Sequence, residues 1–239
     1  MSLYYDFHIH SALSPCGDDD MTPNNIVNMS VLKGLDAIAV TDHNSALNVR
    51  ACHECGKAAG LVVLCGIEIE TAEEVHVVGL FDNPDAAEKM GEFVSSNMPV
   101  IKNRVDIFGN QYVMNEDDET ICEIENLLST ASFLDIGTAV EKIREFGGVA
   151  IPAHVDKTSY SIISNLGFIP EEMDFSIVEI KMPERVEELS KNHNILKYKF
   201  IHNSDAHFLW DIHEKEFCLP LEKSNPTDII NYLKQKQVF

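Results

Sequence analysis

Residue types that bind divalent metals recur in five short stretches of the chain. These are Asp6-Phe7-His8-Ile9-His10, Thr41-Asp42-His43, Glu68 with His76, His154, and Ser204-Asp205-Ala206-His207. Imidazole and carboxylate groups together suit zinc, iron and manganese. The five stretches therefore predict a site for more than one metal ion.

Each stretch follows a segment that is expected to form a strand. His8 and His10 end the apolar segment Leu3 to Phe7, and because alternate strand residues share a face, both imidazoles can bind one ion. Asp205 and His207 repeat this spacing near the other terminus. An isolated pair of this kind is more often a hydrogen-bonded polar pair. Its recurrence at strand ends, where α/β barrels place their chemistry, favours a metal site.

Strand and helix signals alternate along the chain as a parallel α/β barrel requires. The expected strands cover residues 3–8, 36–41, 61–69, 75–81 and 149–153, with shorter ones at 176–180 and 199–203. A helix is expected over residues 22–33, since Thr22 can cap it, Pro23 fits its first turn and Gly34 follows its end. A second helix is expected over residues 45–59.

The alternation lapses between residues 83 and 147. Helices are expected there over residues 85–96, 118–129 and 138–146, with an irregular piece at 104–114. This predicts a helical insertion over 83–147 within one domain that spans residues 1–239. The insertion would either cover the site and shape substrate choice or only add stability.

The motifs resemble the polymerase and histidinol phosphatase (PHP) family over most of the chain. The resemblance is carried by Asp6-x-His8-x-His10, an Asp ahead of Thr22-Pro23, Thr41-Asp42-His43, Gly66-Ile67-Glu68, His76, Ala153-His154 and Ser204-Asp205-Ala206-His207. Members have a distorted (β/α)7 TIM-like barrel with two or three metal ions, and many are phosphoesterases. The resemblance implies the same α/β fold and a metal-dependent phosphoric ester hydrolase here.

The resemblance also implies a ligand set for zinc, manganese or iron. One ion would be held by His8, His10, Glu68 and Asp205, a second by Glu68, His76 and His154, and a third by Asp18, His43 and His207. Glu68 would bridge two ions. Asp6 and Asp42 lie beside ligands in the sequence, and we expect them to hold the second ring nitrogen of a ligand histidine.

The loop after His10 departs from the family pattern, which usually has Ser-x-x-Ser-Asp-Gly. This chain has a longer loop with three adjacent carboxylates at residues 18–20. Counting back from Thr22 selects Asp18 as the ligand. Asp20 and, more remotely, Cys16 are the alternatives.

Grouped metal ions can clamp a phosphoryl group and lower the pKa of a bound water. A metal-bound hydroxide is then the expected nucleophile, with Glu68, Asp205, His154 and His207 at the reaction centre. His154 or His207 could protonate the leaving alkoxide only if it is not saturated as a ligand, so no general acid is assigned.

Phosphate also needs cationic contacts besides the metals. Lys157 follows His154 by three residues, Lys181 follows a predicted strand, and Arg104 lies in the insertion. We expect these three side chains to be the substrate contacts, although a single Lys or Arg is most often a surface residue.

The charge balance bears on the substrate. The chain has 18 basic and 39 acidic residues, a formal net charge of −21, which should repel long duplex nucleic acid. A small phosphomonoester, such as a nucleotide or a sugar phosphate, is the leading prediction. The alternatives are a nuclease or phosphodiesterase that acts on nucleic acid ends, and a noncatalytic metal-binding module. The amidohydrolase barrels, which also begin with His-x-His, fit the later motifs less well.

The remaining composition predicts a cytoplasmic protein. The sequence lacks a run of about 20 apolar residues, which a membrane span needs, and its start does not resemble a signal peptide. Six cysteines at irregular spacing do not suggest a disulfide framework. Cys52 and Cys55 form a C-x-x-C pair in a predicted helix, and we expect packing rather than a metal or redox role for them. The sequence does not indicate an oligomeric state.

Overall fold

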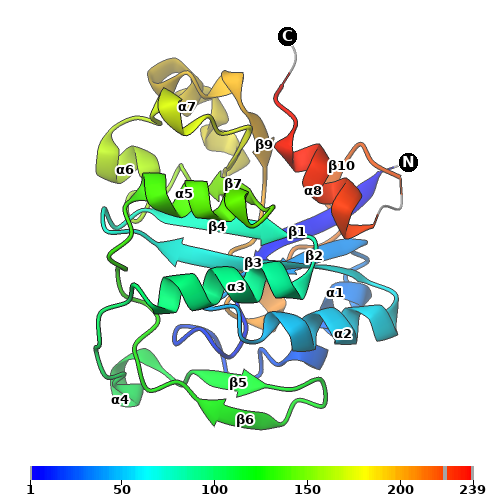
Figure 1. Cartoon of the computed structure of the whole chain (residues 1–239). Helices are drawn as coiled ribbons and strands as arrows, with labels where there is room; N and C mark the ends of the chain where they lie inside the picture. The colour runs from blue at the N-terminus through cyan, green and yellow to red at the C-terminus, as the bar shows by residue number, and fades with distance from the viewer. Residues whose placement is uncertain (1, 223–224, 238–239) are drawn as a thin grey trace.

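The computed structural model describes residues 2–222 and 225–237. A curled sheet has the strand order β10-β1-β2-β3-β4-β7, as Figure 1 shows. Its strands are β1 (Leu3–Ile9), β2 (Ala37–Val40), β3 (Val62–Glu70), β4 (His76–Phe81), β7 (Val149–Pro152) and β10 (Cys218–Leu219). A parallel pair, β8 (Ile177–Glu179) and β9 (Lys199–Ile201), continues beyond β7. The segment after β9 returns to β1 through a bridge between Ile9 and Ala206. The predicted distorted TIM-like barrel is confirmed.

The sheet is not uniformly parallel, which corrects the sequence-based expectation. β1, β2 and β3 run parallel, but β4 is antiparallel to both β3 and β7. The cause is the short connection between β3 and β4, because so few residues can join only antiparallel neighbours. As a result Glu70, at the end of β3, pairs with His76, at the start of β4. The end of β3 and the start of β4 therefore lie at the same edge of the sheet.

The barrel interior changes from apolar to polar toward that edge. On β3, Leu64 lies in the inner core and Glu68 follows on the same face. On β8, Ile177 lies in the inner core and Glu179 follows in the same way. The apolar part of the interior contains Leu3, Tyr5, Phe7, Ala37, Ala39, Leu64, Val78, Leu80, Val149, Ile151, Ala153, Ile177 and Ile201. Each fully buried aliphatic or aromatic side chain of this kind contributes about 1.5–3 kcal/mol, so the apolar part can hold the polar edge in place.

The helices cover the outside of the sheet. They are α1 (Pro23–Leu32), α2 (Val49–Ala59), α3 (Pro84–Ser95), α4 (Val105–Phe108), α5 (Ile136–Glu145), α6 (Ile162–Leu166), α7 (Val186–His193) and α8 (Pro226–Lys234). Short 3-10 turns occur at Glu171–Met173, Pro183–Arg185, Ile195–Lys197 and Leu209–Asp211. The predicted first helix is confirmed with its cap, since the Thr22 side chain accepts from the Asn25 amide. α8 adds Ile229, Ile230 and Leu233 to the inner core.

The region 83–147 is only partly helical. α3 and α5 are confirmed, and both pack on the sheet. The helix expected over 118–129 is wrong, because that segment contains β6 (Thr120–Glu123), which pairs with β5 (Tyr112–Met114) as a hairpin. All four residues of β6 are exposed, so the strand is exposed on both faces. That this region is an insertion stays a prediction.

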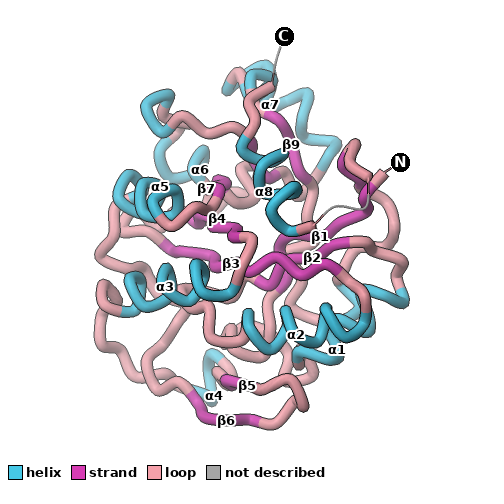
Figure 2. Tube along the Cα trace, turned by 45° about the vertical axis from the view of Figure 1, so that its right-hand side comes forward, coloured by secondary structure: helices cyan, strands magenta, loops and turns pink. Residues whose placement is uncertain are grey.

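The β5–β6 hairpin lies apart from the main sheet, with α4 beside it (Figures 1 and 2). It touches the loop after β1, since the Tyr112 amide donates to the Ala12 carbonyl at 2.8 Å. The Asn110 side chain donates to the Asp19 carboxylate at 2.9 Å. The hairpin therefore supports the loop that departs from the family pattern.

Among the described residues, no helix is both long and apolar enough to cross a membrane.

Candidate metal centre

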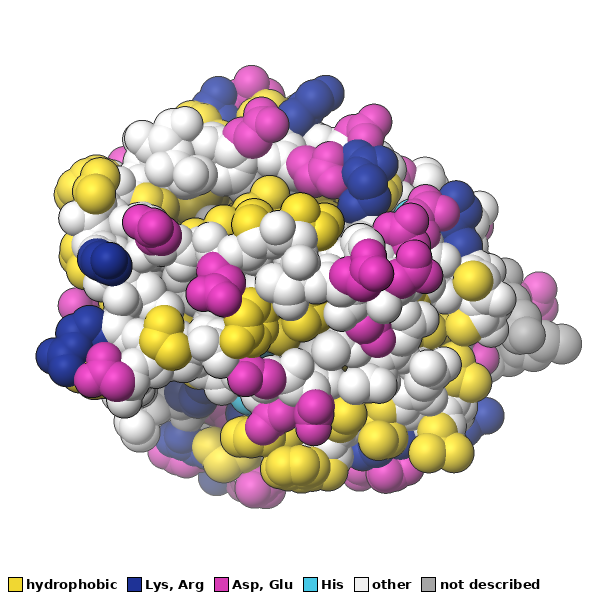
Figure 3. Space-filling model, turned by 90° about the horizontal axis from the view of Figure 1, so that it is seen from below, with side chains coloured by type: hydrophobic (Ala, Val, Ile, Leu, Met, Phe, Trp, Pro, Cys, Tyr) yellow, Lys and Arg dark blue, Asp and Glu magenta, His cyan; other side chains and the backbone are white. Residues whose placement is uncertain are grey.

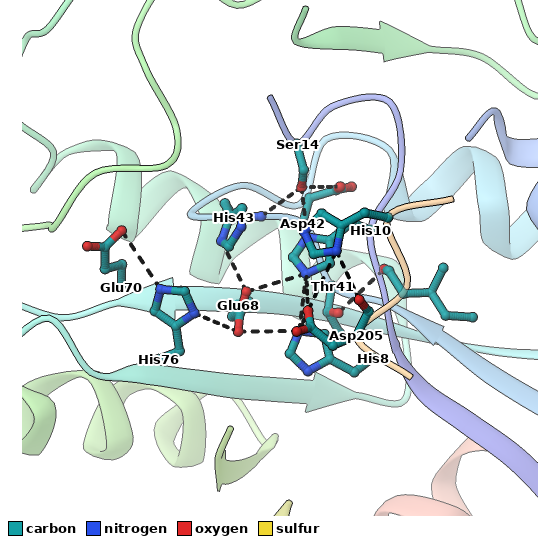
Figure 4. A network of polar contacts seen from close by, with 12 residues as sticks. His8, His10, Ser14, Thr41, Asp42, His43, Glu68, Glu70, His76 and Asp205 are labelled. Carbon is teal, nitrogen blue, oxygen red and sulfur yellow. Dashed lines mark hydrogen bonds and ion pairs between the residues drawn. The ribbon is translucent and has the colours of Figure 1, made fainter. Parts of the chain in front are cut away.

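Glu68 lies at the centre of the polar edge of the barrel, and imidazoles surround its carboxylate (Figure 4). The side chain of Glu68 is 1% exposed. Its Oε1 lies 2.9 Å from His76 Nδ1, 3.2 Å from His154 Nε2 and 3.3 Å from His8 Nε2. Its Oε2 lies 3.0 Å from His43 Nδ1 and 3.4 Å from His10 Nε2. Four stretches that are distant in the sequence therefore supply donors to one buried cluster.

Asp205 completes the cluster on the side of β1. Its Oδ1 lies 3.3 Å from His10 Nε2 and 3.6 Å from His8 Nε2. The structure thus brings together all four residues of the first predicted ligand set. Glu68, His76 and His154 of the second set also meet.

The nitrogen and oxygen atoms of the cluster are arranged better for binding metal ions than for hydrogen-bonding to one another. The Nε2 atoms of His8 and His10 face each other at 3.2 Å. Buried polar atoms without a hydrogen-bond partner include His43 Nδ1, Glu68 Oε2, His76 Nε2 and His154 Nδ1. Buried polar atoms are nearly always paired, so this concentration of unpaired donors supports a divalent metal centre at this place.

Two residues of the cluster adopt backbone angles that are rare for side chains other than glycine. His154 has a φ of 29° and Asp205 a φ of 53°. Each lies in the loop that follows a strand, His154 after β7 and Asp205 after β9. Strain of this kind costs about 1–3 kcal/mol and concentrates at functional sites.

Burial and neighbouring opposite charges shift the pKa values of the cluster in opposite directions. Burial disfavours the charged form of Glu68, but the neighbouring His76 and His8 hold its pKa well below the usual range. Burial also lowers the pKa of His8, yet the carboxylates around it, with Glu179 first, raise it well above the ordinary value. Protons on such imidazoles neutralise the carboxylates in the absence of metal, and bound metal would replace them.

Glu179 is a buried carboxylate that the sequence interpretation missed. Its oxygens lie 3.0 and 3.1 Å from His8 Nδ1. It also accepts from the His154 amide at 2.9 Å and from the Asn203 side chain at 2.7 Å. A carboxylate at the end of a predicted strand was the available signal, and it is the same signal that marks Glu68.

Asp42 and Asp6 support the cluster differently from the expectation. Asp42 accepts from the Ser14 hydroxyl at 2.7 Å, and Ser14 Oγ lies 2.9 Å from His10 Nδ1. Asp42 therefore reaches a histidine only through Ser14. Asp6 accepts from the backbone amides of Ser204 and His213. Its carboxylate thus positions the loop that carries Asp205 rather than an imidazole.

The third predicted ligand set is only partly assembled. His43 and His207 form a group with His10 in which one nitrogen of each lies within 4.8 Å of the others. The Asp18 carboxylate instead accepts from the Asp20 amide at 2.9 Å, and Asp20 is exposed. Cys16, in the same loop, is exposed. Burial raises the pKa of its thiol, but the positive charge of His207 and His43 outweighs burial and lowers this pKa to about 6.

The three predicted phosphate contacts have different positions. Lys157 Nζ lies 2.9 Å and Lys181 Nζ 3.3 Å from Asp205 Oδ2, so both ammonium groups reach the edge of the cluster. Arg104 is paired with Asp106 on the exposed helix α4. No contact joins Arg104 to the cluster among the described residues.

The cysteine pair of α2 lies in the core, as predicted. Cys52 and Cys55 pack in the cluster that α1, α2 and the sheet form. All six cysteines are free.

The PHP domain family model matches residues 6–161. The match includes every predicted ligand except Asp205 and His207 and spans more than half of the sequence. The chain therefore belongs to the PHP domain family.

Among curated proteins, the chain is similar to a 5'-3' exoribonuclease of Haemophilus influenzae. The two are 25% identical over 195 residues, which are 64% of this chain and 69% of the relative. The other curated relatives are matched over 51% of their length or less.

Two solved structures have a similar fold. One is a protein of Bifidobacterium adolescentis that is provisionally described as a metal-dependent phosphoesterase, with a TM-score of 0.60, 17% identity, and coverage of 97% of this chain and 95% of that chain. The other is the lesion-specific endonuclease Q of Pyrococcus furiosus, with a TM-score of 0.61, 17% identity, and coverage of 87% of this chain and 49% of that chain. The family and the buried donor cluster together define a metal-dependent phosphoesterase.

Proposed function

We propose that the protein hydrolyses a small phosphomonoester, such as a nucleotide or a sugar phosphate. The observation that carries this proposal is the pair of ammonium groups at the edge of the donor cluster. Lys157 and Lys181 share one oxygen of Asp205, and the other oxygen of Asp205 faces His8 and His10. A phosphate bound between the lysines would lie directly beside the predicted metal ligands.

The two lysines remain accessible to a substrate. Their side chains are 37% and 38% exposed, whereas that of Asp205 is 5% exposed. Burial lowers the pKa of Lys157, but Asp205 outweighs this and raises it, so Lys157 is charged at neutral pH. Two cations suit the dianion of a monoester better than the single charge of a diester.

The chain's own residues supply the geometry for hydrolysis. Glu68 and Asp205 hold the imidazoles of five strand ends at one place, and the lysines orient the phosphate. When bound, divalent ions would lower the pKa of a water and neutralise charge on the phosphoryl oxygens. Ligand roles for His8, His10, His43, His76, His154 and His207 are part of this proposal.

The surface charge supports a small substrate. Acidic side chains are spread over the face that Figure 3 shows, and the formal net charge is −21. Such a surface repels a polyanion over most of its area. A small phosphate ester meets only the local field of the lysines and the metal centre.

A nuclease that acts on nucleic acid ends is the second candidate. The Haemophilus relative is named an exoribonuclease, and endonuclease Q is described as a lesion-specific endonuclease. In this chain, Phe208 and Trp210 stack at 4.8 Å directly after His207, and Trp210 is 70% exposed. An exposed aromatic pair can stack on nucleobases, so it also suits a nucleotide.

Phosphate release from a substrate panel tests the proposal. The protein is reconstituted with manganese, zinc or iron and assayed on sugar phosphates, nucleoside monophosphates and bisphosphates, and short oligonucleotides. Asp205→Ala is the inactive variant, and Asp211→Ala, at an exposed position, is the matched control. Release from small monoesters that Asp205→Ala abolishes supports the proposal. Cleavage confined to oligonucleotides supports the nuclease, and inactivity with bound metal supports the noncatalytic module.

A further inference from the structure

The loop that follows β7 brings several side chains to the donor cluster. It begins with His154, which is a member of the cluster. Lys157 comes next, and its ammonium group lies 2.9 Å from Asp205. The loop ends at Tyr160, directly before Ser161, which caps α6. The Ser161 hydroxyl donates to the Lys157 carbonyl at 2.9 Å, so the loop is fixed between its two ends.

Tyr160 packs directly on one histidine of the cluster. Its ring centroid lies 5.0 Å from that of His76, with an angle of 30° between the two ring planes. The His76 amide donates to the Tyr160 carbonyl at 3.0 Å. The ring and the backbone of Tyr160 are therefore both held against the start of β4, where His76 Nδ1 lies 2.9 Å from Glu68.

The backbone of Tyr160 is strained, although its side chain is only partly buried. The φ of Tyr160 is 55°, a value that is rare for a bulky residue. Such strain persists where the surrounding structure imposes it, and it concentrates at functional sites. His154, at the other end of the loop, shares this strain. Tyr160 is 46% exposed, so burial of its ring offsets little of the strain, and folding alone does not account for a tyrosine here.

We propose that the Tyr160 ring stacks on a nucleobase of the substrate and thereby selects nucleotides over sugar phosphates. The ring packs on His76 on one side, and its exposed part can receive a planar group. The phosphate would lie at Lys157, three residues earlier, so that one loop would hold both ends of a nucleotide. Stacking of this kind accepts every base, because each base has a π-face. This inference rests on the proposed function and narrows its substrate class.

Two monoesters that differ in the base test the inference. Adenosine 5'-monophosphate and ribose 5-phosphate share the phosphate ester and the sugar. The KM for each compound is measured with the metal-reconstituted wild type and with Tyr160→Gly, Tyr160→Asn and Tyr160→Phe. Glycine and asparagine lack the ring and tolerate a positive φ, so both variants should fold. Asn194→Gly, at an exposed position with a φ of 50°, is the matched control.

The wild type should have the lower KM for the nucleotide. Tyr160→Gly and Tyr160→Asn should raise the nucleotide KM by about 10–100-fold and leave the KM for ribose 5-phosphate unchanged. Tyr160→Phe and Asn194→Gly should keep both wild-type values. Competition with a chromophoric chelator should give the wild-type zinc affinity for every variant, because the ring acts on the substrate and not through His76.

A wild type that does not distinguish the two compounds, or that prefers ribose 5-phosphate, overturns the inference and leaves the proposed function standing. An unchanged nucleotide KM in Tyr160→Gly and Tyr160→Asn also overturns it. An equal rise in both KM values with a weaker zinc affinity does the same, since the ring would then act by positioning His76. A wild type that releases phosphate from no monoester overturns the proposed function, and this inference with it.

Discussion

Replacement of Glu179 by glutamine tests how far the metal centre depends on a carboxylate behind the histidines. Glu179 is fully buried and accepts from three donors, His8 Nδ1, the His154 amide and the Asn203 side chain. Glutamine has nearly the same shape but only one acceptor oxygen. Its amide group must therefore point at one of the three donors, and the charge opposite His8 is lost.

The expected magnitudes follow from these contacts. One buried donor left unpaired costs about 1–3 kcal/mol. Removal of one partner of a buried ion pair costs about 3–5 kcal/mol in total, so the metal-free variant should lose roughly 3 kcal/mol of its unfolding free energy. The second nitrogen of a ligand histidine also loses its acceptor, which should weaken metal binding by about 10–100-fold.

Two measurements check this prediction. Guanidinium denaturation of the metal-free protein gives the change in unfolding free energy, and competition with a chromophoric chelator gives the zinc affinity of the folded protein. Glu172→Gln, an exposed change in the preceding 3-10 turn, is the matched control. A zinc affinity of Glu179→Gln within about twofold of the wild-type affinity would refute the reasoning. The orientation of His8 for zinc binding would then not depend on Glu179.

Three further predictions concern the substrate, the metal and the barrel core. Lys157→Ala should raise the KM for a phosphomonoester by about 10–100-fold through loss of a charge-assisted hydrogen bond, while the exposed control Lys191→Ala leaves it unchanged; an unchanged KM in Lys157→Ala would remove this residue as a substrate contact. Chelation should lower the melting temperature and added zinc should restore it, because free zinc at 100 times the Kd stabilises the folded protein by about 2.7 kcal/mol. A melting temperature that neither treatment changes contradicts a metal centre in the folded state. Gly66→Ala should destabilise the protein by about 1–3 kcal/mol, because a Cβ there would lie 2.5 Å from Thr41 Cγ2 and 2.9 Å from the Val40 carbonyl oxygen. Thermal denaturation at constant zinc checks the last prediction, and a melting temperature equal to that of the wild type would contradict it.

The sequence predicted most of the donor cluster because its signals are local. His8 and His10 are two residues apart on one strand, and Glu68 ends a long apolar strand, so spacing alone places each side chain on the inner face. The cap at Thr22 is equally local, because it needs only the side chain and the next turn. The resemblance to the family then indicated that distant stretches contribute to one site, which spacing along the chain could not indicate.

The errors arose where the outcome depended on distant contacts. Residues 118–129 carry no strong periodicity, and only pairing with β5 makes β6 a strand. Arg104 could not be separated from Lys157 by sequence, because both are single cations and only the fold brings one of them to Asp205.

The sequence by itself thus determined the types of donors and the strands that carry them, since periodicity and residue chemistry are properties of short segments. Only the tertiary structure decided which of those donors share one place. The loop after β9 brings Asp205 to within 3.3 Å of His10, and the loop after β7 brings His154 to within 3.2 Å of Glu68. Both outcomes depend on contacts between residues far apart in the chain, which spacing along the sequence does not record.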